Sequence, residues 1–342
     1  MQTETHRPGR LAILLAVCGT LVAGSAWAAR PKDQAGFLES KAFFKPELSV
    51  SSAHSRLETI EQALANKAEW GQFRAAGASA LAGGQPFRAY IDPRSGVASN
   101  IMGAFPLIPG SGVGNQITAA SLGVSSVDAA AVAQAVRGFV SAHRGILGVD
   151  VSQLGEVNAT QIHKDLWQFT IPQVYQGVPV RDGRVAGTIV KGNLVLIGAE
   201  SWGNVRISRH ALVSAQQALE RGFAHVEGRI AQDELLAGPT LEILPVAPAE
   251  FQVGEKFSGP VGKGYGHRLV WSFVFSRPPD DARWETLVDA HTGEVLALQD
   301  KNLYVDRQIT GGVYPLTDTG ICPNNETCGV MQSGWPMPFA DT

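Results

Sequence analysis

The side chains that could support chemistry in this chain are histidines, scattered carboxylates, one glycine-rich stretch and a late pair of cysteines. None of the eight histidines stands at the i, i+4 spacing that places two metal ligands on one helix face. The chain has neither a His-Glu-x-x-His motif nor a Gly-x-Ser-x-Gly nucleophile elbow. The stretch GKGYG at 262–266 lacks phosphate-loop spacing and no apolar helix follows it, which favours a hairpin loop.

The remaining polar candidates each have a structural interpretation. Asp280 and Asp281 follow two prolines, where solvated carboxylates of a turn are expected. Asp289 precedes the turn AHTG, and an aspartate there usually accepts a hydrogen bond from the backbone two residues on. His143 lies at the margin of an apolar helical stripe and is interpreted as a partly buried core histidine. We therefore predict no catalytic residue, no cofactor and no metal site in this chain.

The first 28 residues predict export. Arg7 and Arg10 precede the apolar run LAILLAVCGTLVAG, and small residues follow at Ala26–Ala28 with the spacing of a cleavage site. Cys18 raises lipid attachment as an alternative, but Val17 is bulkier than that processing usually tolerates. No later stretch reaches the ~20 apolar residues that a membrane span needs. We expect a secreted or periplasmic protein without membrane attachment after cleavage of residues 1–28.

Composition and charge indicate the class of protein. The chain is 44% hydrophobic and 17% charged, with a formal net charge of -3, which is typical of globular protein with enough apolar material for more than one core. This balance gives no electrostatic footprint for nucleic acid. Cys322 and Cys328, separated by five residues, favour a small disulfide loop in an oxidising compartment. Two thiols without a nearby histidine pair do not complete a tetrahedral zinc site.

The elements that would position these residues begin with an N-terminal α+β region at 29–109. Its stretch 56–76 predicts a helix with Leu57, Ile60, Leu64 and Ala68 on one face, and 86–103 predicts a strand, a turn and a second strand. A linker rich in Gly and Ser occupies 110–124.

A second unit is expected at 125–205. Its helix begins after an N-cap at Ser125 or Ser126 and ends at Gly148. The alternation of Trp167, Phe169 and Ile171 with polar residues predicts a strand, and Asp182-Gly183 predicts a hairpin turn. The strand LVLIGA is apolar on both faces and predicts cover on both sides.

The segment 206–302 repeats this plan. Ser214 and Gln217 predict a capping box, and strands follow at 240–246 and 267–276. The stretch WETLVDAHTGEVLALQD predicts a hairpin that turns at 290–293. Residues 303–342 lack periodicity and form an irregular tail, the expected start of a following domain. The fold class is α+β, with tandem units that each pack a helix on an antiparallel sheet.

Two stretches carry a family resemblance. WQFTIPQVYQGVPVRDGRVAGTIV resembles the FTP domain, the fungalysin/thermolysin propeptide module, and LVWSFVF followed by WETLVDAHTGEVL resembles a PepSY domain. The FTP resemblance rests on Phe169, Gln173, Tyr175, Gly177, Val178, Pro179 and Val180. The PepSY resemblance rests on Trp271, Val288, Asp289, Ala290, Gly293 and Val295. Together they imply cystatin-like units in the order found in secreted metalloprotease precursors.

This resemblance implies a pro-region that assists the folding of a zinc metalloendopeptidase and inhibits it until cleavage. Its expected partner is the cognate catalytic domain, where the zinc belongs, and no zinc ligand or catalytic residue can be assigned to any position here. We expect the chain to represent the pro-region of a precursor that stops at Thr342. The alternative is a free-standing secreted binding or inhibitory module. Docking is expected through strand edges and the main chain of Val178-Pro179-Val180, with the side chains of Val178 and Val180 facing outward.

Overall fold

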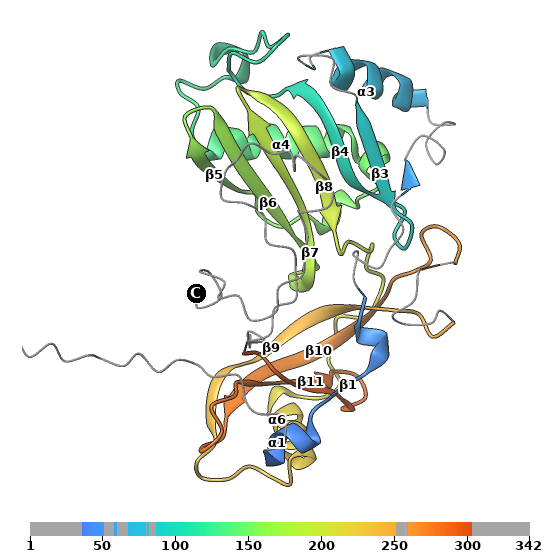
Figure 1. The fold of residues 1–342 in the computed structure, drawn as a ribbon, viewed down its shortest axis with the longest axis vertical. Coiled ribbons are helices and arrows are strands. Elements are labelled where there is room, and N and C mark those ends of the chain that lie inside the picture. The colour runs from blue at the N-terminus through green and yellow to red at the C-terminus, as the bar shows by residue number, and fades with distance from the viewer. Residues whose placement is uncertain are drawn as a thin grey trace, which may run out of the picture. The chain divides into compact units, whose positions relative to one another are not determined.

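The computed structural model describes residues 36–50, 58–59, 68–79, 81, 87–250, 257 and 259–302. The predicted signal segment, the helical positions Leu57, Ile60 and Leu64, the cysteines Cys322 and Cys328 and the tail from 303 lie outside this part of the chain. The fold is mixed α/β, with extensive antiparallel sheet and few helices (Figure 1). Its helices are α1 (Phe37–Lys41), α3 (Ala68–Ser79), α4 (Ala129–Ala142), α5 (Arg144–Leu147) and α6 (Ala215–His225), with 3-10 turns at η1 (Pro46–Leu48), η4 (Ala120–Leu122) and η5 (Val151–Gln153).

The strands of the unit Ala35–Lys301 form two antiparallel sheets that a parallel bridge between β7 and β9 joins into one. In the first sheet the order is β5-β6-β7-β8-β4-β3-β2, and in the second it is β9-β10-β11-β12-β1. The strands of the first are β2 (Glu58–Thr59), β3 (Arg88–Asp92), β4 (Val97–Pro106), β5 (Asn158–His163), β6 (Leu166–Tyr175), β7 (Val178–Val190) and β8 (Asn193–Glu200). Those of the second are β1 (Phe43–Phe44), β9 (Glu234–Val246), β10 (Gly266–Ser276), β11 (Trp284–Asp289) and β12 (Val295–Asp300).

Helix α4 covers one face of the first sheet. Its valines at 132, 136 and 140 recur at helical spacing and enter one core with Phe169 and Ile171 of β6, whose alternating pattern predicts a strand. The helix begins one turn later than expected, because Asp128 caps it by accepting from Ala131 N at 2.8 Å. Burial of β8 is strong at Leu194 and Ile197 and only partial at Val195 and Leu196, so the expected two-sided cover is not found.

Helix α6 packs on the second sheet as its sequence predicts. The capping box at its start is present, with Ser214 Oγ accepting from Gln217 N and Gln217 Oε1 accepting from Ser214 N. The ring of Phe223 lies 5.6 Å from that of Phe273 and 4.9 Å from that of Phe275, centroid to centroid. These rings belong to the buried core that α6 shares with β10 and β11.

The predicted hairpin turn at Asp182-Gly183 is wrong. The chain reverses between β6 and β7 at Gln176 and Gly177, where both residues have positive φ, 49° and 88°. Strand β7 then continues through Asp182, whose φ of 60° marks a β-bulge rather than a turn. Asp182 has the positive φ that a type I′ turn also needs, so the local sequence indicated the conformation of this one residue but not its topological role.

The N-terminal region at 29–109 contributes to both sheets. Strand β1 pairs with β12, with Phe43 opposite Leu298. The hairpin of β3 and β4 turns at 93–96 as expected, and β4 pairs with β8, with Ile101 opposite Ile197. The predicted helix at 56–76 is wrong at its start, because Glu58–Thr59 form β2, which pairs with β3. Helix α3 begins at Ala68 and packs through Trp70 and Phe73 into the core of the first sheet. These residues therefore complete the two sheets that the later segments build.

Candidate functional site

The bulge in β7 places a buried charge cluster at the junction of the two sheets. Pro172 of β6 pairs with Arg184 and Val174 pairs with Pro179, so four residues of β7 stand opposite Gln173 alone. Freed from β6, Val180 makes a parallel bridge with Ile243 of β9. The next residue, Arg181, therefore projects toward carboxylates of the second sheet.

Arg181 binds two glutamates from different strands. Its Nε and Nη2 donate to Glu242 of β9 at 2.9 and 2.6 Å, and its Nη1 and Nη2 donate to Glu285 of β11 at 3.0 and 2.7 Å. Gln299 Nε2 also donates to Glu285 at 2.7 Å, and Lys301 Nζ lies 3.6 Å from the same carboxylate. All four carboxylate oxygens thus have a partner. We call this group, Arg181 with Glu242, Glu285, Gln299 and Lys301, the Arg181 cluster.

Burial and pairing act in opposite directions on the charges of this cluster. Burial raises the pKa of Glu285, but hydrogen bonds from Arg181 and Gln299 outweigh it, so the pKa lies below its ordinary value. Burial lowers the pKa of Arg181, and the hydrogen bonds to both glutamates more than reverse this, which raises it. Arg181 and Glu285 therefore stay ionised at neutral pH, and they form an ion pair between strands rather than a proton donor.

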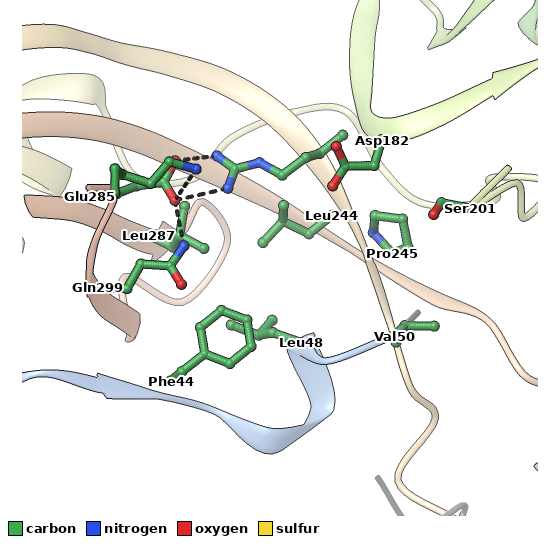
Figure 2. A pocket seen from close by; sticks show the side chains of 12 residues that line it. Phe44, Leu48, Val50, Asp182, Ser201, Leu244, Pro245, Glu285, Leu287 and Gln299 are labelled. Atoms are coloured by element: carbon green, nitrogen blue, oxygen red, sulfur yellow. Dashed lines mark hydrogen bonds and ion pairs between the residues drawn. The ribbon is translucent and has the colours of Figure 1, made fainter. Parts of the chain in front are cut away.

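A cavity of about 370 Å³ adjoins the Arg181 cluster (Figure 2). Figure 2 shows Glu285 and Gln299 on one side, Phe44 and Leu48 below them, and Asp182 and Ser201 at the far end. Asp182 and Ser201 are non-glycine residues with positive φ, 60° and 46°. Such conformations persist only where the surrounding structure imposes them. Because Arg181, Glu285 and Lys301 at this cavity already pair with one another, they leave little for a ligand to bind.

The predicted FTP residues of β6 are core residues. Phe169 is buried beneath α4, and Gln173 is fully buried. Gln173 Nε2 donates to Gln153 Oε1 at 2.9 Å and to the Gly203 carbonyl at 2.8 Å, which ties β6 to η5 and to the segment after β8. Tyr175 is half-buried at the end of the strand, and Gly177 forms the hairpin turn.

The prediction that Val178 and Val180 face outward is wrong. Val178 is 9% exposed and Val180 is 5% exposed, and both pack in one cluster with Ile243 and Leu269. Pro179 between them is exposed, as strand alternation requires. The main chain of this stretch is also engaged, since Pro179 pairs with β6 and Val180 pairs with β9. It is not a free strand edge.

Of the predicted PepSY residues, Asp289 and Gly293 lie at the turn between β11 and β12, and Trp271 lies in β10. Asp289 Oδ1 accepts from His291 N at 2.9 Å and Thr292 N at 2.8 Å, which confirms its predicted structural role. Gly293 closes this turn with a φ of 76°. Trp271 is half-buried, and its Nε1 donates to the Val213 carbonyl at 2.8 Å while its ring touches two core clusters.

A second, larger cavity of about 670 Å³ lies beside Asp289. Arg268 lines it and donates from Nη1 to Asp289 Oδ2 at 3.1 Å, while its Nη2 lies 3.6 Å from Glu47 Oε1. Burial lowers the pKa of His267 to about 4, against the smaller opposing effect of a hydrogen bond to the Gly203 backbone. The Nε2 atoms of His267 and His291 are buried and have no hydrogen-bond partner within the described residues. We call this space the His291 cavity.

The other candidates for chemistry are accounted for by packing. The amides of Gly262 and Gly264 donate to the carbonyls of Pro93 and Arg94, so the GKGYG stretch is a loop packed on the β3–β4 turn. The ring of His143 lies 4.5 Å from that of Phe139, and burial lowers its pKa. Within the described ranges, no three His, Cys, Asp or Glu side chains gather so as to hold a metal ion. None of the helices in these ranges is long and apolar enough to span a membrane.

The family comparison identifies the second sheet. Residues 212–298 match the family described as peptidase propeptide and YPEB domain, PepSY. The match includes α6 and strands β9 to β11, together with most of β12, and it contains Trp271, Asp289 and Gly293.

Comparison with whole proteins adds little. The solved structure titled "Bacillus megaterium YpeB C-terminal domain" is 12% identical, and the alignment covers 69% of this chain and 98% of that chain with a TM-score of 0.29. No curated protein matches the chain significantly.

Apart from Asp289, the residues of the Arg181 cluster and of the His291 cavity were not among those predicted from the sequence. Arg181, Glu242 and Glu285 were not predicted to meet, and neither were Glu47, Arg268 and His291. One signal was present at Glu285, which interrupts the apolar strand WETLVD, because a charged residue buried in such a strand requires a partner. No comparable signal identifies that partner as Arg181, which lies 104 residues earlier.

Proposed function

We propose that this chain is a secreted pro-region that assists the folding of a zinc metalloendopeptidase and inhibits it until cleavage. The observation that carries the proposal is the PepSY domain at 212–298, a module described as a peptidase propeptide. The resemblance of 167–190 to FTP, immediately before it, supports the same assignment. In this proposal the two sheets are tandem cystatin-like units, and the zinc belongs to the protease.

A pro-region of this kind works through contact area rather than reactive groups. A standard interface buries ~1,600 Å², enough to cover a substrate cleft. The described part of the chain offers paired ions and buried hydrophobic clusters, without a grouping of metal ligands. Folding assistance requires a stable template, and the Arg181 cluster with the Val180–Ile243 bridge gives the two sheets a fixed connection.

Strand β5 is the edge that we propose for docking. Among the described strands it pairs only with β6, and its residues are mostly exposed, including Ile162 at 56%. An open edge presents backbone N–H and C=O groups to an extended segment of a partner. An extended protease segment adding to β5 would bind largely through its main chain, so we expect inhibition to depend only weakly on salt.

The test uses the purified full chain and the zinc metalloendopeptidase secreted by the same cells. Casein hydrolysis is measured against increasing chain, and the yield of active protease is measured after refolding with and without it. We expect saturable inhibition and a higher refolding yield. A folded chain that does neither would contradict the proposal and support the free-standing binding module instead.

A matched pair of variants locates the interface. Ile162→Lys should weaken inhibition at least tenfold without changing the unfolding midpoint. Leu212→Lys is the control, because Leu212 is a still more exposed aliphatic residue, at 77%, and lies away from β5. Equal inhibition by the two variants would exclude β5 as the docking edge while leaving the inhibitory function itself intact.

A further inference from the structure

The two cavities differ in whether their polar groups are satisfied. In the Arg181 cluster both glutamates accept close hydrogen bonds on both oxygens. In the His291 cavity, Glu47 is contacted by Arg268 only at 3.6 Å, within the described residues, and two imidazole nitrogens have no partner. The carboxylate of Glu47 is partly exposed, so it keeps acceptor capacity for a ligand that carries hydrogen-bond donors.

The charges at the cavity favour a cation. Glu47 and Asp289 each contribute one negative charge and Arg268 contributes one positive charge, which leaves the group at -1. Asp289 is engaged by Arg268 and by two backbone amides, whereas Glu47 is partly exposed. An anionic ligand would meet two carboxylates. A cationic ligand would meet Glu47 as a carboxylate acceptor.

The apolar part of the wall fits a long aliphatic stem. Pro46, Ile207, Val246 and Ala247 line the cavity beside the charged residues. Arginine and lysine combine a cationic, donor-rich head with such a stem. The volume of about 670 Å³ lies within the range of ligand pockets and admits a side chain together with its flanking backbone.

We propose that the His291 cavity binds an arginine or lysine side chain of a partner polypeptide. Glu47 accepts from the cationic head, and the wall at Val246 and Ile207 covers the stem. This inference goes beyond the proposed function and stands on the cavity alone, because its test uses no protease.

The test titrates the full chain with N-acetyl-L-arginine amide and N-acetyl-L-lysine amide, followed by NMR of backbone amides and histidine rings. We expect saturable shifts at Glu47, Arg268 and His291. N-acetyl-L-norleucine amide has a similar stem without the charge and should bind at least tenfold more weakly. Equal binding of norleucine, or no saturable shift with either cation, would overturn the proposal. Free L-arginine binding more tightly than the blocked amide would overturn the assignment to a polypeptide.

Two variants and a control localise the effect. Glu47→Gln should weaken arginine-amide binding at least fivefold, and Thr292→Asp, at an exposed position on the rim, should strengthen it about threefold. Glu200→Gln removes a carboxylate that is half exposed and lies outside the cavity, and should leave binding unchanged. All variants are compared at equal unfolding midpoints. Unchanged binding by Glu47→Gln, with the fold intact, would refute the site.

Discussion

The Arg181 cluster and the His291 cavity are built from similar residues but do different work. Each joins one arginine to two carboxylates on separate segments of the chain, Glu242 and Glu285 in the first and Glu47 and Asp289 in the second. In the first, the guanidinium makes four hydrogen bonds between 2.6 and 3.0 Å. In the second, Arg268 makes one hydrogen bond of 3.1 Å and one contact at 3.6 Å.

This difference shows why residue type alone does not identify a binding site. In a fully paired ion cluster every charged group already bonds within the fold, so removing one member should lower stability. An incompletely paired cluster retains capacity for a ligand, so its loss should appear mainly as lost binding. The following substitutions test whether changes in the Arg181 cluster lower stability and changes in the His291 cavity lower binding.

The largest effect is expected at Arg181. Arg181→Ala leaves Glu242, with 13% of its side chain exposed, without this counter-charge, and leaves Glu285, with 6%, with only the longer contact to Lys301 at 3.6 Å. Breaking one side of a buried pair costs about 3–5 kcal/mol, because the remaining charges are uncompensated. Denaturant unfolding of the full chain measures this loss.

Arg184→Ala is the matched control three residues along the same strand. Its ion pair with Glu200 is half exposed on both sides, and exposed pairs contribute about 0–1 kcal/mol. Similar losses for the two variants would mean that the Arg181 cluster is no stronger than a surface pair, and the comparison would fail.

Trp271 tests the packing between two hydrophobic core clusters of the second sheet. Trp271→Ala removes a ring that touches both core clusters and leaves the Val213 carbonyl without its indole donor. We expect a loss of about 3 kcal/mol, at the lower end for a tryptophan because the side chain is only half-buried. Trp271→Phe should recover roughly half of this loss. A cost below about 1 kcal/mol would show that the ring packs as a surface residue.

His267 should make stability depend on pH. Its folded pKa of about 4 lies below the ordinary 6.5, so the unfolded chain binds a proton in this window that the folded chain does not. Its contribution is therefore fully present above pH 6.5 and falls by up to about 3 kcal/mol as pH drops to 4. Unfolding by urea at several pH values measures the slope.

His267→Gln should flatten this dependence without removing it. The pKa of His143 is also lowered by burial, so it contributes in the same direction. Glu285 and Asp289 have lowered pKa values as well, but they lose stability at pH values below the ordinary carboxyl range. An unchanged slope between pH 6.5 and 4 in His267→Gln would show that this ring does not titrate as its burial requires.

Local features of the fold were predictable from the sequence, whereas partners distant in sequence were not. Local chemistry predicted the capping box at Ser214, the turn at 290–293 and the structural role of Asp289. These features depend on residues within one turn of each other. The bulge at Asp182 was mistaken for a hairpin, because local sequence reports positive φ but not how many residues face the neighbouring strand.

Pairing across the chain had no local signal. Phe43 joins Leu298 in one sheet, and Ile101 joins Ile197 in the other. Which strand a short apolar segment joins is decided by the edge left open by the rest of the fold, and periodicity does not encode that edge. For the same reason, the sequence did not predict the Arg181 cluster or the His291 cavity, because their members come from strands and turns far apart in the chain.

The smallest effect on stability is expected at Asp289, in the His291 cavity. Asp289→Asn keeps an oxygen that accepts from the amides of His291 and Thr292, but it removes the charge that pairs with Arg268. We expect a loss of about 1 kcal/mol, because the partly exposed arginine remains solvated. The affinity for N-acetyl-L-arginine amide should fall by a larger factor than the equilibrium constant of folding does, because the charged groups at the cavity then sum to zero. A stability loss as large as that of Arg181→Ala, with binding unchanged, would place Asp289 with the structural ion pairs instead.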